Sequence, residues 1–109
     1  MNGGYYIKPT LVRTDKKIKT EKVLDENISI KILPILRKIV STKEGTAQLA
    51  DIYGYDIGGK TGTANKSLKG VYSNEKVNTF VSVFPTTKPK FILAVMLDAP
   101  KINSDYIYN

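Results

Sequence analysis

Apolar residues recur at helical spacing in one segment of the chain, from Asp25 to Ser41. The apolar positions of this segment stand three or four residues apart, as on one face of a helix: Ile28, Ile32, Ile35, Leu36 and Ile39. We expect Asp25 or Asn27 to cap the start, because a side-chain oxygen there can accept a free backbone N–H. Pro34 lies inside the pattern and is expected to kink the helix or to move its start later.

Two later segments have the composition of β-strands. Residues 79–84 concentrate aromatic and β-branched side chains, and residues 91–97 are continuously apolar, which suits a strand covered on both faces. The link "PTTKP" between them is short enough for a hairpin, so the two strands should pair antiparallel. The glycine-broken stretch from Gly59 to Ala64 is expected to be a further strand beside Thr79 to Phe84. These elements predict an α+β fold, a mostly antiparallel sheet with one main helix.

The remaining segments are less regular. Residues 3–14 are expected to be extended chain at a sheet edge, because Pro9 cannot donate to a ladder. Residues 15–22 alternate lysines with apolar and acidic residues, which indicates a solvated strand or hairpin face. Residues 41–54 look like a loop with at most one helical turn, and residues 65–76 like a polar, turn-rich loop.

Composition excludes several kinds of site. The 109 residues fit one domain or a piece of one. Cysteine and histidine are both absent, which removes disulfides, thiolate metal sites, the usual zinc ligand and the usual general base. The net charge of +7 comes with scattered lysines and without a recognisable module, so nucleic-acid binding is not expected. No apolar run reaches the roughly 18 to 20 residues of a membrane span, and the N-terminus lacks the apolar region of a signal peptide. The chain made alone is therefore expected to be cytoplasmic.

The string "GYDIGGKT", Gly54 to Thr61, satisfies the phosphate-loop pattern G-x-x-x-x-G-K-[ST]. The later apolar strand even ends in Asp98, as an acidic magnesium partner would. A phosphate loop follows a buried strand and opens a helix, whose N-terminal amides hold the phosphates. Here glycine, asparagine and two threonines follow Lys60 and make a poor first helical turn. A nucleotide-binding piece is therefore an alternative that its context disfavours.

The stretch "KTGT", Lys60 to Thr63, also suits an active-site strand. K-T-G is one of the motifs of β-lactamases and penicillin-binding proteins, beside S-x-x-K and S-x-N. A lysine on an edge strand supplies positive charge to a carboxylate, and neighbouring hydroxyls donate hydrogen bonds to it. The simplest alternative is a glycine-rich turn with a solvated lysine. A third class is a non-catalytic interaction module that uses its exposed sheet edges.

Beyond this motif, nearly the whole chain resembles the C-terminal part of the transpeptidase domain of class B penicillin-binding proteins of cell division or elongation. "NGGYYIKPTLV" is similar to the family's N-G-G segment, and "ILRKIVSTKEGTAQLADIYGYDIGGKTGTA" to its helix, G-T-A loop and active-site strand. "NTFVSVFPTTKPKFILAVMLDAP" resembles the two strands that follow. The resemblance implies a partial penicillin-binding transpeptidase (β-lactamase-like) fold, with residues 1–109 as an incomplete C-terminal part. The parent would be membrane-anchored and periplasmic, and would catalyse peptidoglycan D,D-transpeptidation through an acyl-serine, without a metal or organic cofactor.

The resemblance also assigns residues by position. Lys60 resembles the active-site strand lysine, and Thr61 and Thr63 the hydroxyls that bind the carboxylate of a D-Ala-D-Ala stem peptide or a β-lactam. The Thr63 N–H would complete an oxyanion hole, and Gly62 would allow close approach of the substrate. The S-x-x-K string of this chain is "SNEK", residues 73–76, which follows Lys60 and lies in the expected loop, and no S-x-N string occurs. The chain alone is therefore expected to be inactive, because an acyl-enzyme mechanism needs all these groups together.

The apolar stretch from Phe91 to Leu97 needs cover on both faces, whereas the helix centred on Ile32 to Ile39 can cover one. Each large aliphatic side chain left in water forfeits roughly 1.5 to 3 kcal/mol of burial. An open sheet edge also invites another chain. We therefore predict that the chain pairs with the missing N-terminal part or self-associates, by sheet pairing or segment swapping, with the face of Phe91 to Leu97 buried between copies.

Overall fold

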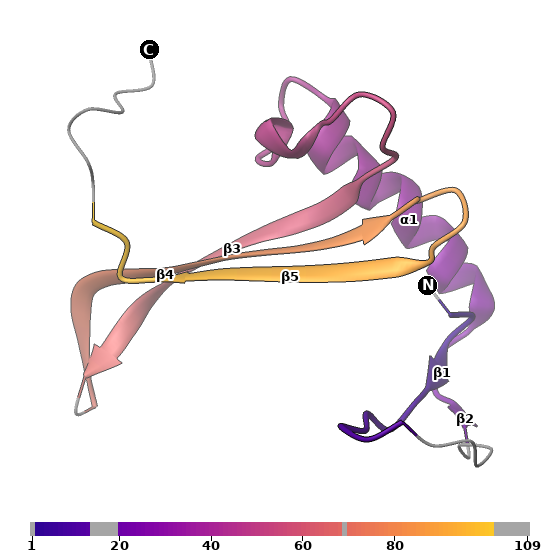
Figure 1. The fold of residues 1–109 in the computed structure, drawn as a ribbon, viewed down its shortest axis with the longest axis horizontal. Coiled ribbons are helices and arrows are strands. Elements are labelled where there is room, and N and C mark those ends of the chain that lie inside the picture. The colour runs from indigo at the N-terminus through magenta and orange to yellow at the C-terminus, as the bar shows by residue number, and fades with distance from the viewer. Residues whose placement is uncertain (1, 14–19, 69, 102–109) are drawn as a thin grey trace.

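The computed structural model describes residues 2–13, 20–68 and 70–101, and Figure 1 shows how their elements are arranged. A small ribbon and one helix precede a three-stranded sheet of order β3-β4-β5, in which both neighbouring pairs are antiparallel. The elements in chain order are β1 (Tyr5–Tyr6), β2 (Glu21–Lys22), α1 (Glu26–Ser41), the 3-10 turn η1 (Gln48–Ala50), β3 (Gly58–Leu68), β4 (Val71–Phe84) and β5 (Phe91–Asp98). The predicted α+β class is confirmed.

Helix α1 begins where the sequence pattern places it. Asp25 is the N-cap, and its side chain accepts the N–H of Asn27 at 2.8 Å. At the other end, the N–H and the hydroxyl of Thr42 both donate to the Lys38 carbonyl. Pro34 lies within the helix, so the later start that proline suggested is wrong. A proline removes one intrahelical bond, and here the cap and the apolar face determine the start.

The three strands pair as predicted; β5 is one residue longer than predicted, and β3 and β4 extend well beyond their predicted bounds. Gly59 is opposite Ser82 in β4, and Phe84 is opposite Phe91 in β5. Within the stretch 65–76, expected to be a loop, residues 65–68 and 71–76 instead extend β3 and β4 into a hairpin arm that projects beyond the helix (Figure 1). The prediction failed because backbone pairing continues along two facing strands, and polar side chains are compatible with a ribbon exposed to water.

The N-terminal segments agree with the expectation of an exposed edge where they are described. Tyr5 and Tyr6 are exposed and pair with Lys22 and Glu21. Most of the lysine-rich run of residues 15–22 lies outside the described residues. The loop after α1 contains the single turn η1, as predicted.

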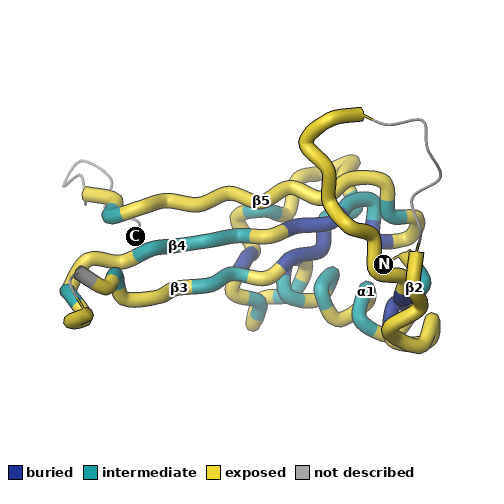
Figure 2. Tube along the Cα trace, turned by 90° about the horizontal axis from the view of Figure 1, so that it is seen from below, coloured by how far each residue is buried: buried dark blue, intermediate teal, exposed yellow. Residues whose placement is uncertain are grey.

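The buried core lies where α1 crosses the start of β3 (Figure 2). Val40 of the helix and Val83 of β4 are 1% and 2% exposed. Gly58 permits this packing, because a Cβ atom there would lie only 2.9 Å from the Arg37 backbone nitrogen. A residue with a side chain at this position would push the helix away from the sheet.

Strand β5 receives no comparable cover within the described chain. All of its residues are exposed, from 44% for Val95 to 71% for Ile92 among its large apolar side chains. Helix α1 packs against β3, so the expectation that β5 would be covered on one face by this helix is wrong. The helix is held by the close approach at Gly58, at the opposite edge of the sheet.

Candidate active-site strand

The stretch Lys60 to Thr63 lies in β3, at one edge of the sheet. The chain remains a strand after Lys60 and continues to Leu68, so no helix opens where a phosphate loop requires one. The carboxylate of Asp98 forms an ion pair with Lys66, at 2.9 Å. The phosphate-loop alternative is therefore wrong for this chain.

Strand pairing determines which backbone groups of β3 face outward. The Ala99 N–H donates to the Lys76 carbonyl at 2.9 Å, so Lys76 and alternate residues of β4 face β5. The intervening residues of β4 then face β3. Thr61 is opposite Phe80 and Thr63 is opposite Asn78, and both of these β4 residues face β5. Because directly opposed residues of an antiparallel pair either both face each other or both face away, the N–H and C=O groups of the two threonines point to the free edge. This is the orientation that a Thr63 N–H needs in order to serve an oxyanion hole.

An amine and two hydroxyls gather at this edge. Lys60 Nζ donates to the Thr61 carbonyl at 2.7 Å and lies 3.5 Å from Thr61 Oγ1. Thr61 Oγ1 in turn lies 2.9 Å from Thr46 Oγ1, which comes from the loop after α1. Thr63 is exposed and two residues along the strand, so its side chain shares a face with Thr61. The structure thus brings Lys60 and Thr61 together, with Thr63 adjacent on the same strand.

Thr46 lies against the Thr61 hydroxyl, and no role was predicted for it. The "GTA" string that contains Thr46 contributed to the family resemblance. Thr46 itself lies in a loop, 15 residues before Thr61 in the sequence. A local pattern cannot show that contact, because the contact depends on how the loop folds back over β3.

Gly62 has a structural role in addition to the predicted one. A Cβ atom at Gly62 would lie 2.6 Å from Thr79 Oγ1 of β4. The glycine therefore leaves room for that hydroxyl within the sheet. The same stretch borders a groove of about 280 Å³, in which hydroxyls stand beside apolar side chains; its lining includes Thr61, Gly62, Thr63, Phe80, Val95 and Leu97.

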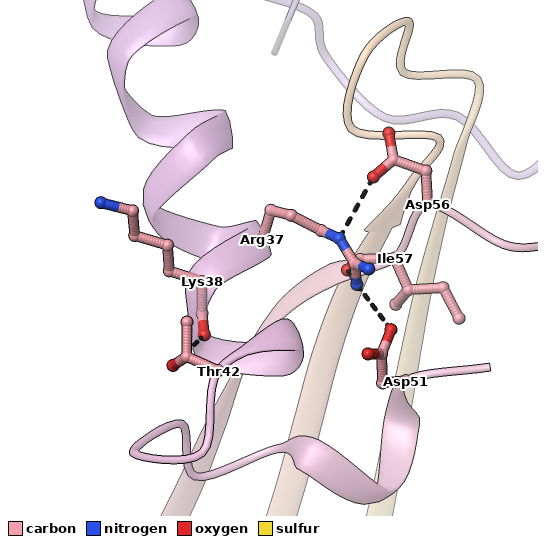
Figure 3. Close-up of polar contacts among 6 residues, drawn as sticks. All are labelled: Arg37, Lys38, Thr42, Asp51, Asp56 and Ile57. Carbon is pink, nitrogen blue, oxygen red and sulfur yellow. Dashed lines mark hydrogen bonds and ion pairs between the residues drawn. The ribbon is translucent and has the colours of Figure 1, made fainter. Parts of the chain in front are cut away.

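Arg37 of α1 holds the chain that leads into β3 (Figure 3). Its Nη1 donates to Asp51 Oδ1 at 2.8 Å and to the Ile57 carbonyl at 3.0 Å, and its Nε lies 3.4 Å from Asp56 Oδ1. Its contacts connect the helix to the residue directly before β3.

Asp56 joins the same anchor to the loop between β4 and β5. The Thr86 N–H donates to the Asp56 carbonyl at 2.8 Å, and the Thr87 N–H donates to Asp56 Oδ2 at 2.9 Å. A hydrogen bond from the Thr86 side chain, with further bonds from Thr87 and the charge of Arg37, holds the pKa of the Asp56 carboxyl below its usual value.

Ser73 and Lys76, the first and last residues of the S-x-x-K string, bond to different partners. Ser73 and Lys76 lie in β4 rather than in the expected loop. The Ser73 hydroxyl donates to the Lys66 carbonyl at 3.0 Å, and Lys76 Nζ bonds to the Asn65 side chain. Lys76 is opposite Asn65, five residues along β3 from Lys60. These contacts stabilise the hairpin arm.

The described ranges offer neither a cluster of metal ligands nor a membrane-spanning helix. Within them, no three acidic side chains stand close enough together to hold a metal ion, and no helix has the length and apolar character of a membrane span. Neither the fold nor the relatives support the cytoplasmic location expected for the chain made alone, which stays a prediction.

Similar proteins place the chain in a family. A family model described as the penicillin binding protein transpeptidase domain matches residues 1–108. A probable peptidoglycan D,D-transpeptidase FtsI of Caulobacter vibrioides is 30% identical over 115 residues, which cover 96% of this chain and 20% of that protein. Stage V sporulation protein D of Bacillus subtilis is 36% identical over 100 residues, which cover 88% of this chain and 15% of that protein.

A solved structure agrees with these relatives. The apo transpeptidase domain of Burkholderia pseudomallei penicillin-binding protein 3 superposes with a TM-score of 0.78 at 27% identity, over 90% of this chain and 30% of that chain. The chain thus spans a fifth or less of the length of the two curated relatives described above, and the expected partial transpeptidase fold is confirmed. The chain belongs to the penicillin-binding protein transpeptidase family.

Proposed function

We propose that residues 1–109 form a C-terminal part of the transpeptidase domain of a peptidoglycan D,D-transpeptidase, and that β3 is its active-site strand. The observation that supports this most is the set of donors at the free edge of β3. The Thr61 hydroxyl lies within hydrogen-bonding reach of both Lys60 Nζ and Thr46 Oγ1, and the Thr63 N–H is directed out of the same edge. Such a set suits an anionic ligand that lies along the strand.

The roles follow from the chemistry of each group. Lys60 supplies positive charge beside the ligand carboxylate and steers protons near the reacting bond. Thr61 and Thr63 donate hydrogen bonds to the carboxylate of a D-Ala-D-Ala stem peptide or of a β-lactam, and the Thr63 N–H forms half of an oxyanion hole. Thr46 positions the Thr61 hydroxyl, because the two oxygens are 2.9 Å apart.

We further propose that the chain alone binds such ligands without reacting with them. Ser73 is engaged with the backbone of the hairpin arm, and the chain carries no other S-x-x-K string. Acylation needs a serine, its base and the middle motif within hydrogen-bond reach of Lys60. In a complete domain those groups would approach the free edge of β3 from other segments.

Amide chemical shifts can test the carboxylate site directly. A peptide ending in D-Ala-D-Ala should shift the backbone amides of residues 60–63, and the same peptide with an amidated C-terminus should not. Thr61→Val and Thr63→Val should each weaken the effect. Thr10→Val, the same change at an exposed N-terminal position, should leave it intact.

Two results would contradict this function. Equal shifts with the free and the amidated peptide would mean that the carboxylate is not recognised. Amide shifts confined to residues 91–98 of β5 would favour a non-catalytic interaction module instead.

A further inference from the structure

The loop that carries Thr46 folds back against the C-terminal end of α1. The Gly45 N–H donates to the Thr42 carbonyl at 3.0 Å, and the Ala47 N–H donates to the Ile39 carbonyl at 3.2 Å. Ala47 is 7% exposed and belongs to the buried core. The residues on both sides of Thr46 are therefore fixed at the end of the helix, whereas Thr46 itself is exposed.

The side chain of Gln48 closes this loop. Its amide nitrogen donates to the Lys43 carbonyl and, at 3.0 Å, to the Gly45 carbonyl. A side-chain amide has two protons, so both bonds can form at once. Gln48 follows Thr46 by two residues, and both acceptors precede Thr46. The Gln48 side chain thus joins the two ends of the turn that carries the Thr46 hydroxyl.

The hydroxyl of Thr61 can offer its proton to a ligand only if its neighbours donate to it. A hydroxyl has one proton and two acceptor positions, whereas the Lys60 ammonium can only donate and a carboxylate can only accept. Lys60 Nζ lies 3.5 Å from Thr61 Oγ1. Thr46 Oγ1 lies 2.9 Å from the same oxygen, and either hydroxyl can be the donor of that bond. If Thr61 gave its proton to Thr46, none would remain for a carboxylate.

We propose that Thr46 donates to Thr61, and that Gln48 holds the Thr46 hydroxyl in place for this bond. Thr61 Oγ1 then accepts from Lys60 and from Thr46, and its own proton is directed to the ligand carboxylate. Gln48 acts through Thr46 rather than on the ligand, so it is a positioning residue. This inference rests on the carboxylate site proposed above, but the role of Gln48 in the loop can be tested without a ligand.

Amide hydrogen exchange tests the role of Gln48 in the free chain. Gln48→Met keeps the length of the side chain and removes the donor. Without the two bonds the loop should open more often, and the Ala47 amide should exchange roughly tenfold faster. Val40 lies within α1, so an unchanged rate for its amide would show that the helix is intact. Leu49→Met is the matched control, since Leu49 is the next residue of η1 and is 87% exposed; it should change neither rate.

Titration with the D-Ala-D-Ala peptide tests whether Gln48 acts through Thr46. Gln48→Met should raise the dissociation constant of the peptide about threefold, as expected for one poorly placed hydrogen bond. Thr46→Val should raise it by at least as much, because the hydroxyl itself is removed. In a Thr46→Val background, Gln48→Met should have no further effect, since the group that Gln48 positions is gone. Leu49→Met should leave the dissociation constant unchanged.

The sign of the Thr46→Val effect tests the direction of the bond between the two threonines. If Thr46 is the donor, the substitution removes a hydrogen bond that orients Thr61, and the peptide binds more weakly. If Thr61 were the donor, the same substitution would free the Thr61 proton, and the peptide would bind equally or more tightly.

Four results would overturn the proposal, each at a different point. An unchanged exchange rate of the Ala47 amide in Gln48→Met would overturn the role of Gln48. Losses of affinity that simply add in the double variant would overturn its action through Thr46 and leave Gln48 as a stabiliser of the loop. Equal or tighter binding by Thr46→Val would overturn the direction of the bond. Equal binding of the free and the amidated peptide by the unmodified chain would overturn the carboxylate site itself, and the exchange of the Ala47 amide would still decide the role of Gln48.

Discussion

Replacing Arg37 with methionine should destabilise the chain, because Arg37 anchors α1 to the segment before β3. The guanidinium contacts three acceptors that all precede β3: Asp51, Asp56 and the Ile57 carbonyl. Methionine retains much of the aliphatic stem and a high helix propensity. The substitution therefore removes the polar contacts with little change to the helix itself.

The magnitude follows from the exposure of the groups. Arg37 is 29% exposed, and its two acidic partners are 40% and 31% exposed. Ion pairs this open to water contribute about 0.5 to 1 kcal/mol each. The bond to the Ile57 carbonyl adds about 1 kcal/mol, at the low end for a charged donor because water reaches it. The expected loss is about 2 to 3 kcal/mol, which should lower Tm by roughly 10 °C or more in a domain of this size.

Thermal unfolding followed by far-UV circular dichroism measures this loss. Lys38→Met is the matched control, since Lys38 is exposed, adjacent on α1 and also basic; we expect it to change Tm little. Arg37→Lys should fall between the two, because it retains the charge but not the planar set of donors. Equal Tm values for Arg37→Met and Lys38→Met would refute the view that Arg37 anchors β3.

Three further predictions concern reactivity, pH and the Thr46 hydroxyl. Incubation with penicillin should give no covalent adduct, and one added β-lactam mass on any serine, found by mass spectrometry after denaturation, would show that this is wrong. The pKa of Asp56 is lowered in the folded chain, so the Asp56 carboxylate stabilises the fold fully above its unfolded pKa of 3.8. This stabilisation is lost as the pH falls through the lower folded pKa. Asp56→Asn should therefore flatten the decline of Tm in this acid range, and an unchanged decline would contradict the prediction. Thr46→Val should weaken the amide shifts caused by the D-Ala-D-Ala peptide while changing Tm little, and Thr46→Ser should restore them; equal binding by both variants would argue against a positioning role.

The sequence was sufficient to predict those features of the fold that depend on neighbouring residues. The cap at Asp25 and the apolar face of α1 are local patterns, and the short link "PTTKP" leaves antiparallel pairing as the simplest connection. The strand containing Lys60 followed from the poor helical character of the residues after it. Each of these features can be found within about ten residues of sequence.

Features that depend on distant contacts were missed. Residues 65–68 and 71–76 form strands because each side of the hairpin pairs with the other. The contact between Thr46 and Thr61, and the partners of Arg37, join segments 14 to 20 residues apart. The lack of cover over β5 follows from the position of α1, which the close approach at Gly58 determines. Composition alone does not specify which edge of a sheet a helix will cover.

The position of the donors also limits how tightly this chain can bind a carboxylate. Lys60 and the hydroxyls of Thr61 and Thr63, the proposed donors to the carboxylate, stand at an open edge, so a ligand would gain at most a few charge-assisted bonds of about 1.5 to 3 kcal/mol each. Association costs about 4 kcal/mol or more in lost translation and rotation. The binding free energy that remains corresponds to a dissociation constant in the millimolar range. The peptide titration therefore needs millimolar ligand to show saturation. A micromolar constant would mean that the ligand contacts more of the chain than this edge, and the groove beside Phe80 would then be the first place to examine by substitution.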